Sequence, residues 1–203
     1  MIGVVDYGAG NLQSVVNAVE WLGGNVTKVW SEDQINECSH LILPGVGSFS
    51  YGASQLEKLQ IVDSLKNHAA VSKKPLLGLC LGMQLLATKG FEFGETNGLN
   101  LIEGEVVRLS QNDLSLRVPH IGWNEIALVK PSKFAHQDRT ARYLYFNHSF
   151  HFKPKNSANV VATVDYGQTV TAIVENENIF GVQAHPEKSQ HYGLALLSHF
   201  IKL

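Results

Sequence analysis

The sequence has little of several features that mark particular protein classes. Its 203 residues include 16 basic and 18 acidic side chains, so no extended field of one sign is expected. Nonspecific nucleic-acid binding needs a basic surface, and this balance argues against it. No apolar run approaches the length of a bilayer span, and residues 1–6 lack the basic start and long apolar stretch of a signal peptide. We therefore expect a cytoplasmic protein without membrane or nucleic-acid partners.

Cysteine is also scarce, because the chain contains only Cys38 and Cys80. Neither the context nor the chain length suggests a disulfide scaffold, and Cys38 is expected to be a reduced structural thiol. No His/Cys cluster has the spacing of a metal-ligand set, so no metal or other cofactor is expected. No repeat, low-complexity tract or linker is visible. Residues 1–203 are therefore expected to form a single domain with a substantial core.

Apolar periodicity predicts an α/β architecture. Buried strands are expected at residues 1–6, 25–30, 40–43 and 75–79, and helices at 12–22, 61–70 and 81–89. Strands connected through helices in this way form a parallel sheet. After Gly90 the pattern changes to short strands separated by turns, at 106–109, 124–129, 142–146, 160–164, 170–175 and 179–183, before a closing helix at 191–201. We predict an open mixed, mostly parallel sheet flanked by helices, with antiparallel additions in the second half.

The most informative segment is Gly-Leu-Cys-Leu-Gly at residues 78–82. It follows an apolar strand and precedes a helical pattern, as in a nucleophile elbow, where two glycines allow a sharp turn that exposes the middle side chain. A helix N-terminus beside the sulfur favours the thiolate. A buried structural cysteine is the alternative, but a core strand gains nothing from the flanking glycines. We predict that Cys80 is a nucleophile, with Gln84 on the same helix face to help hold a substrate.

A nucleophilic cysteine needs a base, and the segment Gln-Ala-His-Pro-Glu at residues 183–187 supplies a candidate. Among the nine histidines of the chain, His185 has a carboxylate, Glu187, two positions further on. This spacing favours His185 over His120 and His148. Cysteine, histidine and glutamate from distant segments fit the roles of nucleophile, base and residue that orients the base.

Two further glycine turns follow predicted strands. Residues 6–11, Asp-Tyr-Gly-Ala-Gly-Asn, partly match a dinucleotide-binding fingerprint. Gln13 stands where the third glycine belongs and Trp30 where an acidic residue belongs, so nucleotide binding is not expected. Residues 44–47, Pro-Gly-Val-Gly, end a strand beside the elbow, and their backbone can turn an amide toward a developing oxyanion. An ordinary loop is the alternative at this position.

Five motifs in order give the chain a family resemblance. Gly-Leu-Cys-Leu-Gly-Met-Gln at 78–84 and Gln-Ala-His-Pro-Glu-Lys-Ser at 183–189 resemble the class I (triad) glutamine amidotransferases. The segments at 6–12, 119–124 and 145–150 resemble the glutaminase subunits of imidazole glycerol phosphate synthase. The resemblance runs from Gly3 to the last helix. It implies that the chain hydrolyses glutamine and passes the ammonia to a separate subunit, with which it forms a heterodimer.

The resemblance also implies the nature of that partner and the roles of further residues. The partner is expected to be a (βα)8 barrel that makes imidazole glycerol phosphate and AICAR in histidine biosynthesis. The implied residues are the triad Cys80, His185 and Glu187; oxyanion amides at Val46, Gly47 and Leu81; glutamine contacts at Gln84, Glu92 and Ser149, with Glu92 on the substrate ammonium; and interface or ammonia-passage residues Asn11, Trp123, Tyr145 and Lys188.

Two positions depart from the family pattern. Ala184 stands where the family usually has an aromatic residue, and Asn147 where it has an apolar one. These departures leave open a paralogous subunit that supplies ammonia to another synthase, such as one that amidates surface sugars. A stand-alone γ-glutamyl hydrolase and a catalytically silent regulatory subunit are further alternatives. The intact Cys80, His185 and Glu187 argue against a silent subunit.

Overall fold

The computed structural model describes residues 1–110, 116–135 and 141–203. In these ranges the helices are α1 (Leu12–Trp21), α2 (Glu32–Glu37), α3 (Phe49–Lys58), α4 (Val62–Lys66), α5 (Leu81–Leu85) and α6 (Gln190–Phe200), with a π-helical turn at Asn67–Val71 and 3-10 turns at Ser157–Asn159 and Pro186–Lys188. The strands are β1 (Ile2–Val5), β2 (Val26–Val29), β3 (His40–Leu43), β4 (Leu76–Leu79), β5 (Lys89–Gly90), β6 (Thr96–Asn97), β7 (Gly104–Arg108), β8 (His120–Glu125), β9 (Ala127–Leu128), β10 (Tyr143–His148), β11 (Phe150–Pro154), β12 (Val160–Asp165), β13 (Thr169–Asn176) and β14 (Ile179–Val182). None of these helices has the length and hydropathy needed to cross a bilayer.

The largest element is an eight-stranded sheet in the order β2-β1-β3-β4-β14-β13-β12-β9. Strands β2, β1, β3, β4 and β14 are parallel to one another. Strands β13, β12 and β9 extend the sheet in antiparallel pairing. The predicted fold class, a mixed and mostly parallel sheet flanked by helices with antiparallel additions in the second half, is confirmed.

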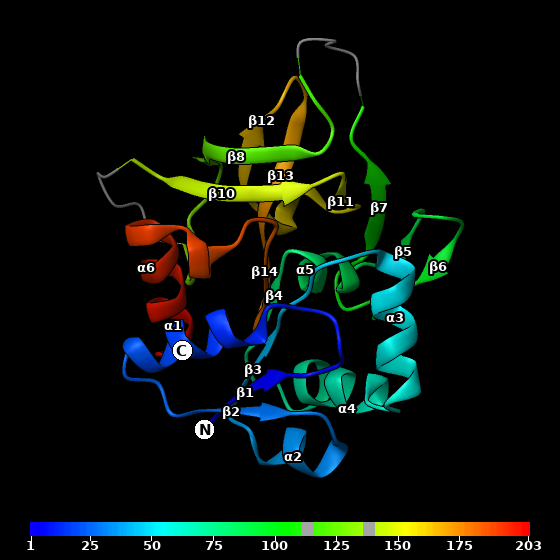
Figure 1. Ribbon diagram of the computed structural model, residues 1–203, viewed down its shortest axis with the longest axis vertical. Coiled ribbons are helices and arrows are strands. Elements are labelled where there is room, and N and C mark those ends of the chain that lie inside the picture. The colour runs from blue at the N-terminus through cyan, green and yellow to red at the C-terminus, as the bar shows by residue number, and fades with distance from the viewer. Residues whose placement is uncertain (111–115, 136–140) are drawn as a thin grey trace.

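Helices cover both faces of the parallel strands (Figure 1). Because successive side chains of a strand point to opposite faces, β3 supplies both layers of the core. Ile42 packs in the cluster that contains α1 and α6, while Leu41 and Leu43 pack in the cluster that contains α3 and α5. Burial on both faces explains why these strands are continuous apolar runs. The layers place the carboxyl ends of β4 and β14 side by side.

Two smaller sheets complete the fold. Strands β8 and β10 form a two-stranded antiparallel ribbon, and β11, β7, β5 and β6 form a second sheet in that order. In Figure 1 the ribbon crosses in front of β12 and β13, beyond the carboxyl ends of the parallel strands. The backbone N–H of His185, just beyond β14, donates to the Tyr145 carbonyl of β10 at 2.9 Å. This ribbon therefore forms one wall of the region beyond the parallel strands.

Several predicted elements are corrected by the structure. The helix predicted at 81–89 ends at Leu85, and Lys89–Gly90 is strand β5. The reason is that the carbonyls of Leu85 and Leu86, which would continue the helix, accept hydrogen bonds from the backbone of residues 99–102. The helix predicted at 61–70 is a short α4 followed by a π-helical turn. The strand predicted at 124–129 divides between β8 and β9, which belong to different sheets.

Other elements were not predicted from the sequence. These are α2, α3, β5, β6 and β11. The buried face of helix α3 combines Phe49 and Leu56 with the small residues Gly52 and Ala53, which weaken its apolar pattern in the sequence. Glycine is favoured at position 52, since a Cβ there would lie 3.1 Å from the Leu81 side chain of α5.

Candidate active site

Cys80 occupies a strained turn between β4 and α5. Its backbone has φ 52° and ψ −108°, a left-handed conformation that is unfavourable for a residue with a side chain. The turn requires both neighbouring glycines, because a Cβ at Gly82 would lie 1.7 Å from the Leu43 carbonyl oxygen, and a Cβ at Gly78 would lie 2.6 Å from Gly82. The Cys80 N–H donates to the Val182 carbonyl at 2.8 Å, which ties the elbow to the end of β14.

His185 and Glu187 form a buried pair beside this turn. The Nδ1 atom of His185 lies 2.9 Å from Oε1 of Glu187, and the two side chains are 6% and 3% exposed. Burial lowers the pKa of His185, but hydrogen bonds with the Cys80 side chain and with Glu187 outweigh burial and raise it to about 10. Since Nδ1 is used by Glu187, Nε2 is the ring nitrogen that remains for Cys80. The structure thus brings together the three residues predicted as a triad.

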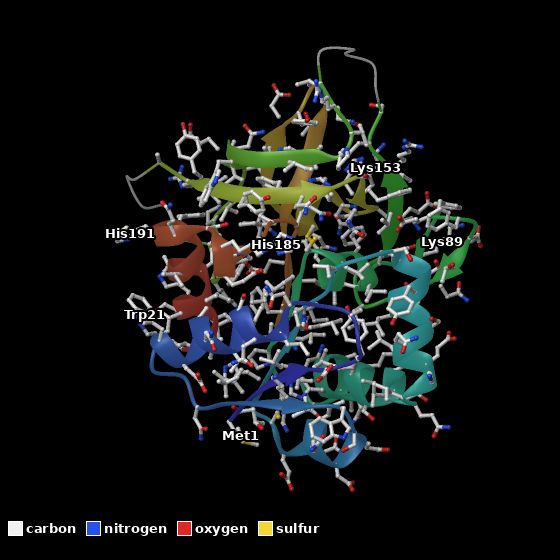
Figure 2. All side chains as sticks on the ribbon, viewed as in Figure 1. Met1, Trp21, Lys89, Lys153, His185 and His191 are labelled. Carbon is white, nitrogen blue, oxygen red and sulfur yellow. The ribbon has the colours of Figure 1, made fainter. Side chains whose placement is uncertain are left out.

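A cavity of about 260 Å³ opens over Cys80 and His185. Figure 2 shows His185 in the middle of the molecule, between the β8–β10 ribbon and the large sheet. The predicted residues that line the cavity are Val46, Gly47, Cys80, Leu81, Gln84, Glu92, Ser149 and His185, and the lining residues that were not predicted as site residues are Pro119, Asn147, His148 and Phe150. The cavity is mostly polar in its lining and suits a small polar ligand better than a drug-sized one.

The segment predicted to supply oxyanion amides lies beside the elbow. Gly47 has φ 104°, and Val46 is exposed. The Gly45 carbonyl accepts a hydrogen bond from the Leu81 N–H at 3.3 Å. Because the carbonyl and the N–H of one trans peptide point in opposite directions, the Val46 N–H points away from Leu81. Below this segment, the buried Tyr7 hydroxyl donates to the Pro44 carbonyl at 2.7 Å.

The three residues predicted to contact glutamine all reach the cavity. The side-chain amide of Gln84 donates to the Phe150 carbonyl at 2.8 Å, so its carbonyl oxygen is the end that remains for a ligand. Oε2 of Glu92 accepts from the Phe49 N–H at 2.8 Å, at the first turn of α3. This leaves Oε1 of Glu92 as an acceptor for a cation. Ser149 lies at the turn between β10 and β11.

The four residues predicted at an interface lie outside the cavity lining. Trp123 and Tyr145 face each other across the β8–β10 ribbon, with ring centroids 5.9 Å apart. Trp123 is 44% exposed, and the Tyr145 ring lies 6.4 Å from that of His185. Asn11 is exposed at the start of α1, where its side chain makes no capping hydrogen bond. Lys188 is exposed on the 3-10 turn directly after the triad.

Sequence reasoning missed several polar residues next to the site. Gln183 is fully buried, and its side-chain nitrogen lies 3.9 Å from the Cys80 sulfur. His148 was considered only as a rival base, yet it lines the cavity and is 6% exposed. The alternation of β10 could have indicated that His148 is buried, because it follows Leu144 and Phe146 on the same face of the strand. No comparable pattern distinguished Gln183.

The fold and this constellation define a class-I glutamine amidotransferase. A family model described as "Glutamine amidotransferase class-I" matches residues 3–203. Two solved structures share the fold over nearly their whole length. One is a crystal structure of a glutamine amidotransferase, with a TM-score of 0.77, 18% identity and coverage of 100% of this chain and 99% of that one. The other is PurLQS from Thermotoga maritima, with a TM-score of 0.77, 20% identity and coverage of 99% and 97%.

Curated relatives define the family more narrowly. The imidazole glycerol phosphate synthase subunit HisH 1 of Campylobacter jejuni (strain RM1221) is 42% identical over 203 residues, which is 100% of both chains. HisH of Zymomonas mobilis is 42% identical over 98% of this chain and 94% of its own, and HisH of Aquifex aeolicus is 39% identical over 97% and 94%. The chain belongs to the HisH family of imidazole glycerol phosphate synthase subunits.

Proposed function

We propose that this chain, as one domain over residues 1–203, is the glutaminase subunit of imidazole glycerol phosphate synthase. The observation that supports this most directly is Cys80, held in a left-handed turn at the floor of a polar cavity and hydrogen-bonded to a buried His185–Glu187 pair. The HisH name of its relatives favours the histidine pathway over a paralogous ammonia acceptor.

The first half of the reaction releases ammonia. The Cys80 sulfur attacks the side-chain carbonyl carbon of glutamine, and the carbonyl electron pair moves onto oxygen. His185, whose raised pKa keeps its imidazole protonated at neutral pH, donates a proton to the amide nitrogen. The carbon–nitrogen bond then breaks, ammonia leaves and a thioester with Cys80 remains. Glu187 stabilises the imidazolium and holds its orientation.

The second half releases glutamate. Neutral His185 takes a proton from a water molecule, and the resulting hydroxide attacks the thioester carbonyl. The carbon–sulfur bond breaks, Cys80 leaves as the thiolate beside the protonated His185, and the new γ-carboxylic acid loses its remaining proton to solvent as glutamate leaves. In both halves the negative charge on oxygen is stabilised by the Leu81 N–H and by an amide of the Val46–Gly47 segment. The steps use only side chains and backbone amides of this chain.

The cavity lining suggests how glutamine is oriented. Oε1 of Glu92 binds the α-ammonium group, because Oε2 is already used by the helix α3 amide. The side-chain oxygen of Gln84 and the hydroxyl of Ser149 provide further polar contacts, since both residues line the same cavity as Cys80. This places the side-chain amide of glutamine over the sulfur.

The ammonia is used by a separate synthase subunit. We infer that this partner is a (βα)8 barrel, that the two chains form a heterodimer in the cytoplasm, and that the product pair is imidazole glycerol phosphate and AICAR. The exposed Trp123 and its neighbour Tyr145 form an aromatic pair of the kind that anchors interfaces. Tyr145 lies near His185 and Lys188 follows Glu187, so with the exposed Asn11 we expect these residues to form the side on which the synthase subunit binds and ammonia leaves.

The function is tested by substituting Cys80→Ser and measuring glutamate release from glutamine in the presence of the synthase subunit. We expect loss of glutamate release with partner binding retained, because an alcohol is a much weaker nucleophile and the fold changes by one atom. Cys38→Ser is the matched control, since Cys38 is buried outside the cavity lining. Glutamate release by Cys80→Ser at close to the parental rate would show that the elbow assignment is wrong.

A further inference from the structure

A set of buried polar side chains connects the β8–β10 ribbon with the nucleophile. Two histidines on the inner face of the ribbon, His120 and His148, are directly opposite each other in its register. They are 1% and 6% exposed. Buried polar groups are costly unless they are hydrogen-bonded, so their partners are informative.

The acceptors in this set determine where each proton lies. Nδ1 of His148 is 2.9 Å from the Phe150 carbonyl, which can only accept, so Nδ1 has the hydrogen. Burial lowers the pKa of His148 to about 3 and that of His120 to about 4, so both rings are neutral at neutral pH. Nε2 of His148 therefore accepts from Nδ1 of His120 at 3.1 Å. Nε2 of His120 in turn accepts from the Asn124 amide at 3.0 Å.

The same carbonyl connects the histidines with the cavity. Phe150 accepts a second hydrogen bond from Nε2 of Gln84 at 2.8 Å. The other amide hydrogen of Gln84 points to Oε1 of Gln183 at 3.1 Å, and Nε2 of Gln183 lies 3.9 Å from the Cys80 sulfur. Both donors of the Gln84 amide are thus used inside the protein. Its orientation, with the oxygen left for the cavity, depends on the Phe150 carbonyl.

Aromatic rings hold the plane of His120. Its ring is stacked on Phe146 at 4.7 Å and 17° and on Tyr166 at 3.9 Å and 23°. The Tyr166 hydroxyl donates to the Arg117 carbonyl at 2.7 Å, which fixes that side of the stack. The His120 ring is therefore held so that Nδ1 faces His148.

We propose that His120 and His148 are positioning residues for the glutamine site, an inference that rests on the proposed glutaminase function. The neutral imidazole of His148 donates to the Phe150 carbonyl, and this carbonyl holds the Gln84 amide with its oxygen toward the substrate. The donor on His120 holds the His148 ring in the orientation that points Nδ1 at the Phe150 carbonyl. Without that donor, the His148 ring is less restrained, and its hydrogen bond to the Phe150 carbonyl weakens.

Two substitutions of His120 separate hydrogen bonding from packing. His120→Phe keeps a flat ring in the stack but removes the donor to His148. His120→Asn loses the ring but keeps an N–H close to the position of Nδ1. The matched control is His151→Phe, because His151 is also buried, at 1% exposed, yet neither of its ring nitrogens has a hydrogen-bond partner in the part of the chain that the structure describes.

The kinetic readout is the KM for glutamine of each variant with the synthase subunit. We expect His120→Phe to raise KM about tenfold with a smaller change in kcat, as the loss of one hydrogen bond to a binding group would do. His120→Asn should retain a KM closer to that of the parent, and His151→Phe should stay within about twofold of it, since it breaks no hydrogen bond. Alkylation of Cys80 by iodoacetamide should be unchanged in all three, because the triad is intact. An unchanged KM in His120→Phe, or an equal rise in His151→Phe, would overturn the proposal.

A spectroscopic readout does not depend on activity. Nitrogen-15 NMR of the parental chain should find His120 and His148 as neutral rings with the proton on Nδ1, and His120→Phe should shift the Nε2 resonance of His148, which loses its hydrogen-bond donor. A parental His148 with its proton on Nε2 would refute the hydrogen-bond chain even if the protein is a glutaminase. If instead the tautomers are as expected but the parental complex releases no glutamate, the proposed function fails, and the positioning role for glutamine fails with it.

Discussion

The Gly45–Val46 peptide leads to a strong prediction about regulation. In the structure the Gly45 carbonyl of this peptide accepts a hydrogen bond from the Leu81 N–H at 3.3 Å, and the Val46 N–H of the same peptide points away from the elbow. The Leu81 N–H and the Val46 N–H are therefore both unavailable to a substrate oxygen. A rotation of this one peptide would free the Leu81 N–H and turn the Val46 N–H toward the same point. We predict that the isolated chain is a poor glutaminase and that the synthase subunit, loaded with its nucleotide ligand, promotes this rotation.

The size of the effect follows from the number of donors involved. Removal of one oxyanion-hole donor typically lowers kcat by about 10²–10³. Since two donors depend on the same peptide, glutamate release by the isolated chain should be at least about 10² below that of the loaded complex. The partner can shift the peptide only if the rotated form makes better contacts across the interface. The exposed Asn11, Trp123 and Lys188 are the side chains through which we expect that coupling.

The assay measures glutamate release by the chain alone, with the synthase subunit, and with that subunit plus its nucleotide substrate or product. Cys80→Ser in each condition gives the background. We expect the largest rate with the loaded partner. Rates that agree within a factor of about two in all three conditions would refute this reasoning, because that range lies far below the effect of one lost donor. A free-standing hydrolase would then be the better interpretation.

The remaining predictions concern the triad and the ribbon. His185→Asn should reduce glutamine turnover more than Glu187→Gln, because Glu187 only stabilises the imidazolium; equal losses would contradict this division. Glu187→Gln should also lower the pKa of His185 from about 10, so that the alkaline limb of the pH–rate profile moves to lower pH. The same raised pKa stabilises the fold fully below the ordinary value of 6.5 and loses this effect as the pH rises to about 10, which denaturation at several pH values would follow. Trp123→Ala should weaken association with the synthase subunit or ammonia transfer without unfolding the chain, whereas a large fall in thermal stability would assign Trp123 to the core.

The sequence by itself determined the elbow and the sheet that presents it. Gly78 and Gly82 could be interpreted from the motif, because a sharp turn from a strand into a helix favours glycine on both sides. The clash of a Cβ at Gly78 is with Gly82, four residues away, whereas the clash at Gly82 is with the Leu43 carbonyl oxygen of β3. The strands β1, β3, β4 and β14 could be found because burial on both faces requires continuous apolar runs. His185 and Glu187 could be paired because they lie two residues apart on one turn.

Only the tertiary structure decided the contacts between segments that are distant in the sequence. Helix α3 is difficult to predict from the sequence because close packing against α5 favours a glycine, Gly52, on its buried face. Helix α5 ends early because backbone N–H groups of residues 99–102 donate hydrogen bonds to the carbonyls at its C-terminal end. The hydrogen bonds from His120 through His148 and Phe150 to Gln84 join four elements, and no local pattern predicts which acceptor each nitrogen meets. The direction of the Gly45–Val46 peptide is likewise set by Leu81, on another segment. Short motifs indicate turns because the steric limits on the backbone depend largely on neighbouring residues. The hydrogen-bond partners of buried polar groups, in contrast, depend on how the sheets and helices pack together.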